Sequence, residues 1–282
     1  MMISFGPGGN SISWGKLKFP ADLPQYLKNL GLNGYEVECG RGVRISDAAK
    51  SLPKLAEEHG LYITLHAPYF ISLSSVDEEK RQNSVGYILE AARAAKEVGA
   101  EKIVVHSGSC SKMSRAEACY LAKRTLINAQ KALDEEGLSD IIICPETMGK
   151  INQLGTLEEV LELCGADERF LPTVDFGHLN ARTLGGIKSR SDYAVMLDMI
   201  ENELGHERLS KMHIHFSKIE YTKGGEKKHL TFADEVYGPD YKPLLEEIYE
   251  RGLEPSIICE SDGTQAEDAA EMKRYYEQLT VK

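Results

Sequence analysis

The sequence predicts a single (β/α)8 barrel, a TIM barrel, over residues 1–282, and two observations predict it. Short apolar runs rich in Val and Ile alternate with longer stretches whose apolar residues recur every three or four positions. This alternation is typical of parallel strands that are buried on both faces and joined by helices. Most of the apolar runs end in a His or an acidic residue. That is the edge of the barrel at which such folds carry their sites, so we expect a metal site at the carboxyl-terminal mouth of the strands.

Eight strands are expected from the apolar runs. They end near Phe5, Cys39, His66, His106, Glu146, Asp175, Phe216 and Glu260. An open, doubly wound sheet is the alternative, but it would carry a GxGxxG motif after its first strand. Gly6-Pro7-Gly8-Gly9 stands there instead. Eight units closing into a barrel is therefore the simpler interpretation.

Helices are expected between the strands. They lie at residues 46–59, 77–98, 114–136, 191–204, 240–251 and 264–279, with one more beginning at Thr156. Ser114-x-x-Glu117 and Thr156-x-x-Glu159 have the pattern of capping boxes, which open helices. Gly99 follows its apolar stripe directly and favours termination. Residues 217–235 are polar and contain glycine, which indicates a long loop at the barrel mouth.

The composition is that of a water-soluble globular protein. Hydrophobic residues make up 42% and charged residues 27% of the chain, and no stretch of 18 apolar residues occurs. This argues against a signal peptide and a membrane span, and we expect a cytoplasmic monomer with no protein partner. The six cysteines form no C-x-x-C pair. They are expected to be buried thiols in a reducing compartment.

The net charge of −11 speaks against a nucleic-acid partner when it is taken alone. A metal site changes this balance locally, since two or three divalent ions add about +4 to +6 at the mouth. The overall charge therefore weakens a DNA hypothesis without excluding it.

Imidazoles and carboxylates at the strand ends form the candidate metal site. Zinc accepts both kinds of ligand, and catalytic sites leave one position open. The expected ligands are His66, His106, Glu146, Asp175, His178, His213 and Glu260. Seven ligands are too many for one tetrahedral ion, and they suit two or three ions that share a bridging carboxylate. Ions about 3.5–4 Å apart clamp both oxygens of a phosphoryl displacement, so phosphoester hydrolysis is the favoured reaction.

Other polar residues near the strand ends are expected to play supporting parts. His215 shares a strand face with His213 and is expected to orient a ligand or contact the substrate. Glu36 and Glu38 are expected to pair with ligands or with basic groups. His59 and His206, each beside a glycine, are expected at the surface.

Six short motifs follow one another along the chain: H-A-P-Y (66–69), V-V-H-S-G-S (104–109), P-E-T (145–147), V-D-F-G-H (174–178), M-H-I-H (212–215) and C-E-S (259–261). The ordered set resembles the endonuclease IV family of apurinic/apyrimidinic endonucleases, which are xylose-isomerase-like TIM barrels. The resemblance implies a barrel that holds three zinc ions. It also implies cleavage of double-stranded DNA on the 5′ side of an abasic site, as in base excision repair.

The resemblance also implies a role for each ligand, with Glu146 as the central catalytic residue. It implies that His66, His106 and Glu146 bind a first zinc ion. Glu146 would bridge to a second ion, which Asp175, His213 and Glu260 also bind. A third ion would be bound by His178, Glu226 and His229. The family has Asp-x-His after its seventh strand, whereas Glu226 and His229 are separated by two residues here. The family's E-N-T-A-G is E-T-M-G-K in this chain. These departures indicate a divergent member.

Three residues match positions that the family uses on DNA. Tyr69 matches an aromatic residue that wedges into the duplex at the lesion, and Phe70 could assist it. Such side chains stabilise a kinked duplex whose damaged nucleotide is swung out. Arg41 falls where the family inserts a DNA-reading loop. Ordinary packing against the barrel rim is the alternative for the two aromatic residues.

Another reaction class fits the same barrel. Sugar isomerases and epimerases of this superfamily bind one divalent metal, often Mn²⁺, and Glu146, Asp175, His213 and Glu260 fit that set too. A single-metal isomerase does not need His66, His106 or the Glu226–His229 loop, and these residues favour the nuclease. A barrel that keeps the ligands only for stability is the third possibility.

Overall fold

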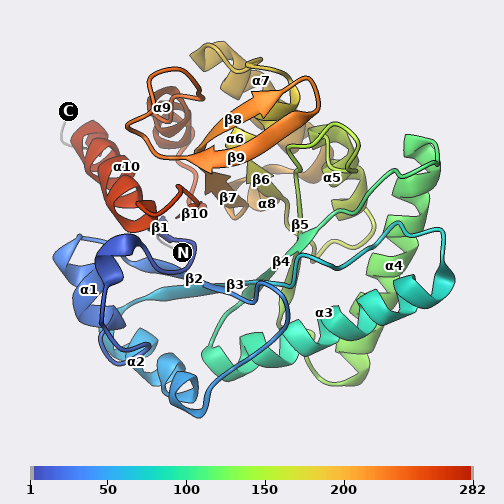
Figure 1. Cartoon of the computed structure of the whole chain (residues 1–282), viewed down its shortest axis with the longest axis horizontal. Helices are drawn as coiled ribbons and strands as arrows, with labels where there is room; N and C mark the ends of the chain where they lie inside the picture. The colour runs from blue at the N-terminus through green and yellow to red at the C-terminus, as the bar shows by residue number, and fades with distance from the viewer. Residues whose placement is uncertain (1–2, 281–282) are drawn as a thin grey trace.

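The structure is a computed structural model that describes residues 3–280, so both ends of the expected 1–282 domain lie outside the described residues. Eight parallel strands form a nearly closed barrel with helices around it, a TIM barrel (Figure 1). In spatial order the strands are β1 (Ser4–Pro7), β10 (Ser256–Cys259), β7 (His213–Phe216), β6 (Thr173–Asp175), β5 (Ile142–Glu146), β4 (Lys102–His106), β3 (Tyr62–His66) and β2 (Gly34–Glu38). A parallel bridge between Gly8 and Glu36 brings the two ends of the sheet together. The predicted barrel is confirmed, and the open sheet is not formed.

The helices surround the strands in chain order. They are η1 (Ile12–Trp14), α1 (Leu23–Asn29), η2 (Asp47–Ser51), α2 (Leu52–His59), α3 (Glu78–Val98), α4 (Arg115–Glu135), α5 (Leu157–Cys164), α6 (Phe176–Arg182), α7 (Arg190–Leu204), α8 (His206–Ser210), α9 (Lys242–Glu250) and α10 (Gln265–Thr280). The sequence did not predict α1, α6 and α8. These helices have seven, seven and five residues, which is too short for a 3.6-residue period to show.

Helix ends follow the predicted capping chemistry. The Ser114 and Glu117 side chains form both halves of a capping box at the start of α4, and Thr156 with Glu159 does the same for α5. Gly99 ends α3 in the left-handed conformation, with φ at 74°. These local contacts set where each helix begins after its strand.

Residues 217–235 are not the loop that the sequence suggested. Most of this segment is an antiparallel hairpin of β8 (Lys218–Thr222) and β9 (Gly225–Leu230), drawn in orange in Figure 1. Its tip is bound to the loop after β5, since the amide of Glu226 donates to the carbonyl of Gly149 and the amide of Ile151 donates to the carbonyl of Gly224, each at 3.0 Å. The hairpin is polar because it lies on the barrel rim and buries little apolar surface. The apolar alternation that identifies a strand is therefore missing.

The strand side chains divide into two sets. Outward residues such as Ile103, Ile143 and Ile257 belong to the hydrophobic cluster that packs against the helices. Several inward residues are polar and fully buried, and they are Glu36, Thr64, Lys102, His213 and Ser256. The barrel interior therefore carries polar groups well below the mouth.

Other expectations can be compared with the described residues. All six cysteines are buried free thiols, and both His59 and His206 are exposed. Among residues 3–280, no helix has the length and apolar character that a membrane crossing requires.

Candidate metal centre

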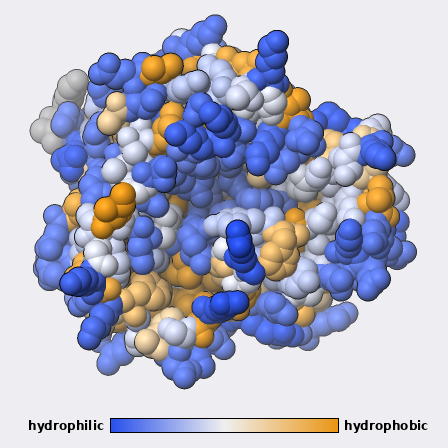
Figure 2. All heavy atoms as spheres, viewed as in Figure 1, coloured by the Kyte–Doolittle hydropathy of each residue, from blue (hydrophilic) through white to orange (hydrophobic). Residues whose placement is uncertain are grey.

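A cavity of about 370 Å³ opens at the carboxyl ends of the strands. Figure 2 shows hydrophilic side chains around a hollow in the middle of this face. Strand ends and the loops that follow them supply the lining, which consists of Gly8, Glu38, His66, Tyr69, His106, Glu146, Met148, Lys150, Gln153, His178, Glu226, His229, Glu260 and Gln265. The fold thus brings residues that are far apart in the chain onto one surface, as in other barrels of this class.

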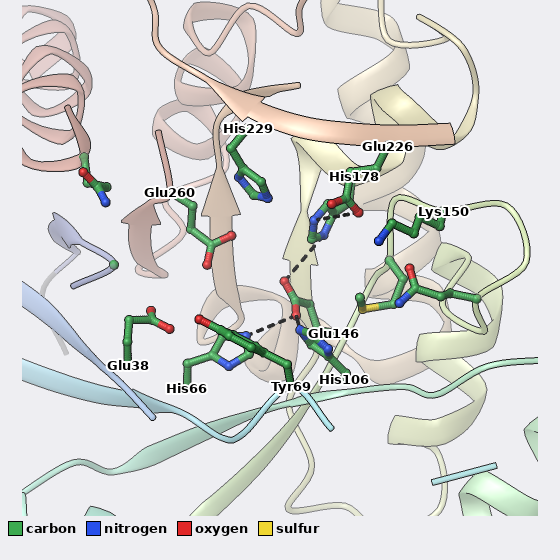
Figure 3. A pocket seen from close by; sticks show the side chains of 14 residues that line it. Glu38, His66, Tyr69, His106, Glu146, Lys150, His178, Glu226, His229 and Glu260 are labelled. Carbon is green, nitrogen blue, oxygen red and sulfur yellow. Dashed lines mark ion pairs between the residues drawn. The ribbon is translucent and has the colours of Figure 1, made fainter. Parts of the chain in front are cut away.

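A wholly acidic group of possible ligands, Glu36, Glu38 and Glu260, borders this cavity. Three further groups around it combine histidine with carboxylate, and the ligand atoms of each group lie within 4.8 Å of one another. They are His66, His106 and Glu146; Glu146, Asp175, His215 and Glu260; and His178, Glu226 and His229. Figure 3 shows Glu146 between the histidines of the first and third groups. Its carboxylate belongs to two of the three groups, which is the arrangement that a bridging ligand requires.

Three of the histidines are held by their outer ring nitrogens. His66 Nδ1 lies 2.7 Å from the carbonyl of Ala67, and His178 Nδ1 lies 2.9 Å from the carbonyl of Thr147. A carbonyl can only accept, so each Nδ1 carries a proton, and in the neutral form that would bind a metal Nε2 keeps the lone pair. His229 Nδ1 lies 2.9 Å from Ser217 Oγ. Such contacts fix the ring and its tautomer, as is usual for histidines that bind metals.

Three buried carboxylates around the cavity each keep an oxygen without a hydrogen-bond partner among the described residues. Asp175 Oδ1 accepts the amide of His178 at 2.7 Å and so caps α6, which leaves Oδ2 unpaired. Glu146 Oε2 is also unpaired, and the Nε2 atoms of His66 and His106 lie 3.5 and 3.4 Å from it. Glu38 Oε1 is the third such oxygen. A buried oxygen without a partner is costly, and a cation between these atoms would satisfy it. The donor set therefore fits divalent metal ions.

The buried ligands have strongly shifted pKa values. Burial lowers the pKa of His106 to about 3, which keeps its ring neutral. Burial also opposes the charged form of His66, but contact with Glu146 and the charge of Glu38 outweigh it and raise the pKa of His66 to about 10. Burial raises the pKa of Glu260 to about 8. In the metal-free protein, protons on His66 and Glu260 therefore reduce the negative charge of the buried carboxylates.

The structure places His215, and not the expected ligand His213, at the mouth, while both histidines form a deeper group of possible ligands with Glu36. His215 Nδ1 lies 3.0 Å from Glu146 Oε1 and 3.5 Å from Glu260 Oε2, whereas His213 Nδ1 is hydrogen-bonded to Ser256 at 2.7 Å. The register explains this, because His215 pairs with Asp175 at the mouth and His213 pairs one layer deeper, with Thr173. Alternation places both rings inside the barrel, and the sequence does not show which of them reaches the mouth.

A β-bulge corrects the spacing of the third group. Along β8 and β9, Glu220 pairs with Lys228 and Tyr221 pairs with Glu226, so Lys227 is an extra residue in β9. The extra residue places Glu226 and His229 on one side of the strand, although two residues lie between them. His178 Nε2 lies 3.6 Å from Glu226 Oε2. The one-residue departure from the family motif therefore does not separate the two ligands.

The residues expected to contact DNA lie at or near the rim. Tyr69 is 52% exposed, and its ring is 5.8 Å from that of His106. Phe70 is 48% exposed and packs edge-on against Tyr87. Arg41 is exposed in the loop after β2. Tyr69 and Phe70 thus each pack against a neighbouring ring and keep about half of their surface exposed.

Several cavity residues were not predicted as site residues. Glu38 was expected only to support other residues, and no sequence motif pointed to Lys150, Met148, Gln153 or Gln265. Lys150 and Gln153 belong to the loop after β5, whose tie to the hairpin tip no sequence pattern shows. Glu36 is fully buried and lies 2.8 Å from His215 Nε2, which fits its expected role of orienting a ligand.

Comparison with known proteins gives relatives along the whole chain. An uncharacterised protein of Methanocaldococcus jannaschii is 35% identical over 280 residues, which is 98% of each chain. A probable endonuclease 4 of Mycoplasma pneumoniae is 30% identical over 176 residues, or 58% of this chain and 57% of that protein.

Two solved structures illustrate the shared fold. Endonuclease IV from Thermus thermophilus aligns with a TM-score of 0.68 at 19% identity, over 99% of this chain and all of that one. A D-tagatose 3-epimerase-like protein aligns with a TM-score of 0.67 at 21% identity, over 91% and 92% of the two chains. At these identities the likeness concerns the fold alone. A family model described as xylose isomerase-like TIM barrel matches residues 24–279. That match, together with the close relative along the full length, shows that the chain belongs to the xylose isomerase-like TIM barrel family.

Proposed function

We propose that this protein is a zinc-dependent apurinic/apyrimidinic endonuclease, which hydrolyses the DNA backbone on the 5′ side of an abasic site in base excision repair. The observation that carries the proposal is the presence of three ligand groups around one cavity, two of them sharing Glu146. Relatives named probable endonuclease 4 support DNA as the substrate.

The three groups would hold two to three zinc ions, with His215 in the place first given to His213. Bound ions of this kind act as Lewis acids on phosphoryl oxygens and activate water at neutral pH. The chain's own contribution is to fix the ligands. The carbonyls of Ala67 and Thr147 orient His66 and His178, and Asp175 keeps one buried oxygen without a hydrogen bond.

Other residues of the cavity suit an anionic polymer. Lys150 is the one Lys or Arg among the described residues that line the cavity, and Figure 3 shows its amine directed into it. We assign it to a backbone phosphate of the substrate. Tyr69 and Phe70 would stack on the bases beside the lesion, and Arg41 would contact the backbone further out.

The direct test uses a duplex with one tetrahydrofuran abasic site, which cannot be cleaved by β-elimination. Zinc-loaded protein should cut this strand once, immediately 5′ to the lesion, and leave a 3′-hydroxyl that a polymerase extends. The undamaged duplex and chelated protein are the controls. An intact lesion strand with fully metal-loaded protein would rule the proposal out.

A single-metal sugar isomerase or epimerase is the second candidate. Glu146, Asp175, His215 and Glu260 form a four-residue group by themselves, and an epimerase-like protein shares the fold. This candidate predicts one Mn²⁺ or Mg²⁺ per chain and interconversion of ketoses. The endonuclease predicts two to three zinc ions. Metal analysis of the purified protein, followed by a ketose assay, separates the two.

A further inference from the structure

A line of buried polar groups crosses the barrel interior below the cavity. Lys102 on β4 is 1% exposed, and its Nζ donates to Ser256 Oγ on β10 at 2.9 Å and to the carbonyl of Lys211 at 2.8 Å. Three strands separate β4 from β10 in the sheet, so the contact spans the inside of the barrel. Ser256 Oγ in turn lies 2.7 Å from His213 Nδ1.

The line continues to the candidate metal centre. His213 Nε2 lies 3.0 Å from Glu36 Oε2, and Glu36 Oε1 lies 2.8 Å from His215 Nε2. The two Nε2 atoms are themselves within hydrogen-bond distance, at 3.0 Å, and both lie next to the same carboxylate. On its other side, His215 Nδ1 faces Glu146 Oε1 at 3.0 Å. Lys102 is thus joined to a candidate ligand through three intervening side chains.

The chemistry of the donors gives the line a direction. An ammonium group only donates, so Ser256 accepts from Lys102, and its hydroxyl keeps one proton and one further lone pair for His213 Nδ1. The carboxylate of Glu36 lies 3.0 Å from His213 Nε2 and only accepts, so it favours the proton of the neutral ring on Nε2, and Nδ1 then accepts the proton of Ser256. The carboxylate of Glu36 likewise favours a proton on His215 Nε2. This leaves the Nδ1 lone pair of His215 directed at the mouth, where a metal would bind.

We propose that Lys102 is a positioning residue that fixes the tautomer of His213 through Ser256, and so orients His215 towards the metal centre without touching metal or substrate. This inference rests on the metal centre of the proposed function and is independent of the DNA substrate. Three neighbours hold the ammonium group of Lys102 in place. Two are its hydrogen-bond acceptors, and the third is the face of the Tyr62 ring, whose centroid lies 5.5 Å from Nζ.

Two variants interrupt the line at different points. Lys102→Met removes the donor while keeping an unbranched chain, and Ser256→Ala removes the bridging hydroxyl. Ser4→Ala is the matched control, because Ser4 pairs with Ser256 in the sheet and is equally buried, yet its hydroxyl is outside the line. Ile103→Ala controls for loss of packing, since Ile103 is the next residue of β4 and faces the helices.

Two measurements apply to every variant without DNA. Long-range ¹H–¹⁵N spectra of protein labelled on histidine nitrogen report which ring nitrogen carries the proton. Competition with a chelator of known affinity gives the dissociation constant for Zn²⁺. Wild-type His213 should be protonated on Nε2. Lys102→Met and Ser256→Ala should mix its tautomers and weaken Zn²⁺ binding by about 10- to 100-fold, which is typical of outer partners of metal ligands.

The outcomes separate positioning from simple stability. Wild-type tautomers and affinity in Ser4→Ala and Ile103→Ala, with losses in the other two variants, would support the proposal. A wild-type His213 protonated on Nδ1 would overturn it, and this holds even if Lys102→Met does not fold. Equal losses in all four variants would also overturn it. If wild-type protein bound no Zn²⁺, the proposed function would fail, while the ring spectra would still decide the role of Lys102.

Discussion

Glu146 joins two of the candidate ligand groups, because its carboxylate lies at the end of β5 between the histidines of β3, β4 and β7. Both carboxylate oxygens of Glu146 face ring nitrogens of these histidines, so no other side chain nearby could take over its position. Its neutral amide analogue has nearly the same shape but loses the charge that would hold two cations together.

Glu146→Gln should therefore lower abasic-site incision by at least about 100-fold and leave the fold unchanged. Single-turnover cleavage and circular dichroism would measure the two effects. Glu158→Gln, an exposed change on α5, is the control and should cut normally. Turnover close to wild type in Glu146→Gln would remove the bridging role.

The exchanged histidines make a second prediction. His215→Ala should lose about one bound metal ion per chain, because His215 faces the cavity ligands. His213→Gln should keep the number of ions and bind them more weakly by about 10- to 100-fold, since His213 acts one layer deeper. Metal analysis after dialysis against a metal buffer measures both quantities. The reverse pattern would restore the assignment made from the sequence.

Tyr69 offers a test of the proposed DNA contact. Tyr69→Ala should raise the dissociation constant for abasic DNA about 10-fold, because a stacked aromatic ring is lost. Metal content should stay the same. Tyr120→Ala on α4 is a matched control with similar exposure. An unchanged dissociation constant in Tyr69→Ala would favour packing as the role of this ring.

Among the elements, the β8–β9 hairpin completes the candidate site. It brings Glu226 and His229 to His178, and the loop after β5 binds its tip. Gly225 occupies the closest approach, with φ at +87° and an ideal Cβ only 2.3 Å from the carbonyl of Gly149. No larger residue fits there without moving the tip.

Gly225→Ala should consequently displace the hairpin and cost about 1–3 kcal/mol of folding free energy. The third ion should be lost first, because both hairpin ligands move with the tip. Gly224→Ala is the neighbouring control, since an ideal Cβ there lies 3.7 Å from Thr222 Oγ1. Urea unfolding and metal stoichiometry measure the effects, and full metal content in Gly225→Ala would contradict this role.

Elements also show where sequence reasoning succeeds and fails. The barrel strands were predictable because each is a short apolar run that ends in a polar residue. The hairpin could not be predicted, because its two strands pair with each other on the rim and have no buried apolar face that would give an alternating sequence pattern. The Lys227 bulge was equally hidden, because an extra residue in one strand is visible only once the pairing is known. The exchange of His213 and His215 has the same origin, in strand register.

For the molecule as a whole, the site couples stability to pH. His66, His178 and Glu260 have folded-state pKa values of about 10, 9 and 8, all above their ordinary values of 6.5, 6.5 and 4.5. Between pH 7 and 9 these three groups therefore hold more protons in the folded chain than in the unfolded chain, and burial of Lys102, which lowers its pKa to about 8, offsets part of this excess. The stabilisation from each of the three groups is complete below its ordinary pKa and is lost as the pH rises through the folded value.

Metal-free protein should thus be less stable at pH 9 than at pH 7, by at least about 1 kcal/mol on the scale of 1.4 kcal/mol per pKa unit. Zn²⁺ should remove this loss, because deprotonated ligands bind it better at the higher pH. Urea unfolding at both pH values, with and without Zn²⁺, measures the difference. Greater stability of the metal-free protein at pH 9 would show that these groups are not protonated in the folded chain.

The line from Lys102 to His215 has a consequence for how variation in this protein is interpreted. Residues at the amino-terminal end of a barrel are usually assigned a purely structural role, and the effect of changing them is judged by the melting temperature. Here a line of contacting polar side chains joins this end to the candidate metal centre. Selection or engineering could therefore retune metal affinity from the far side of the molecule and leave every cavity-lining side chain as it is.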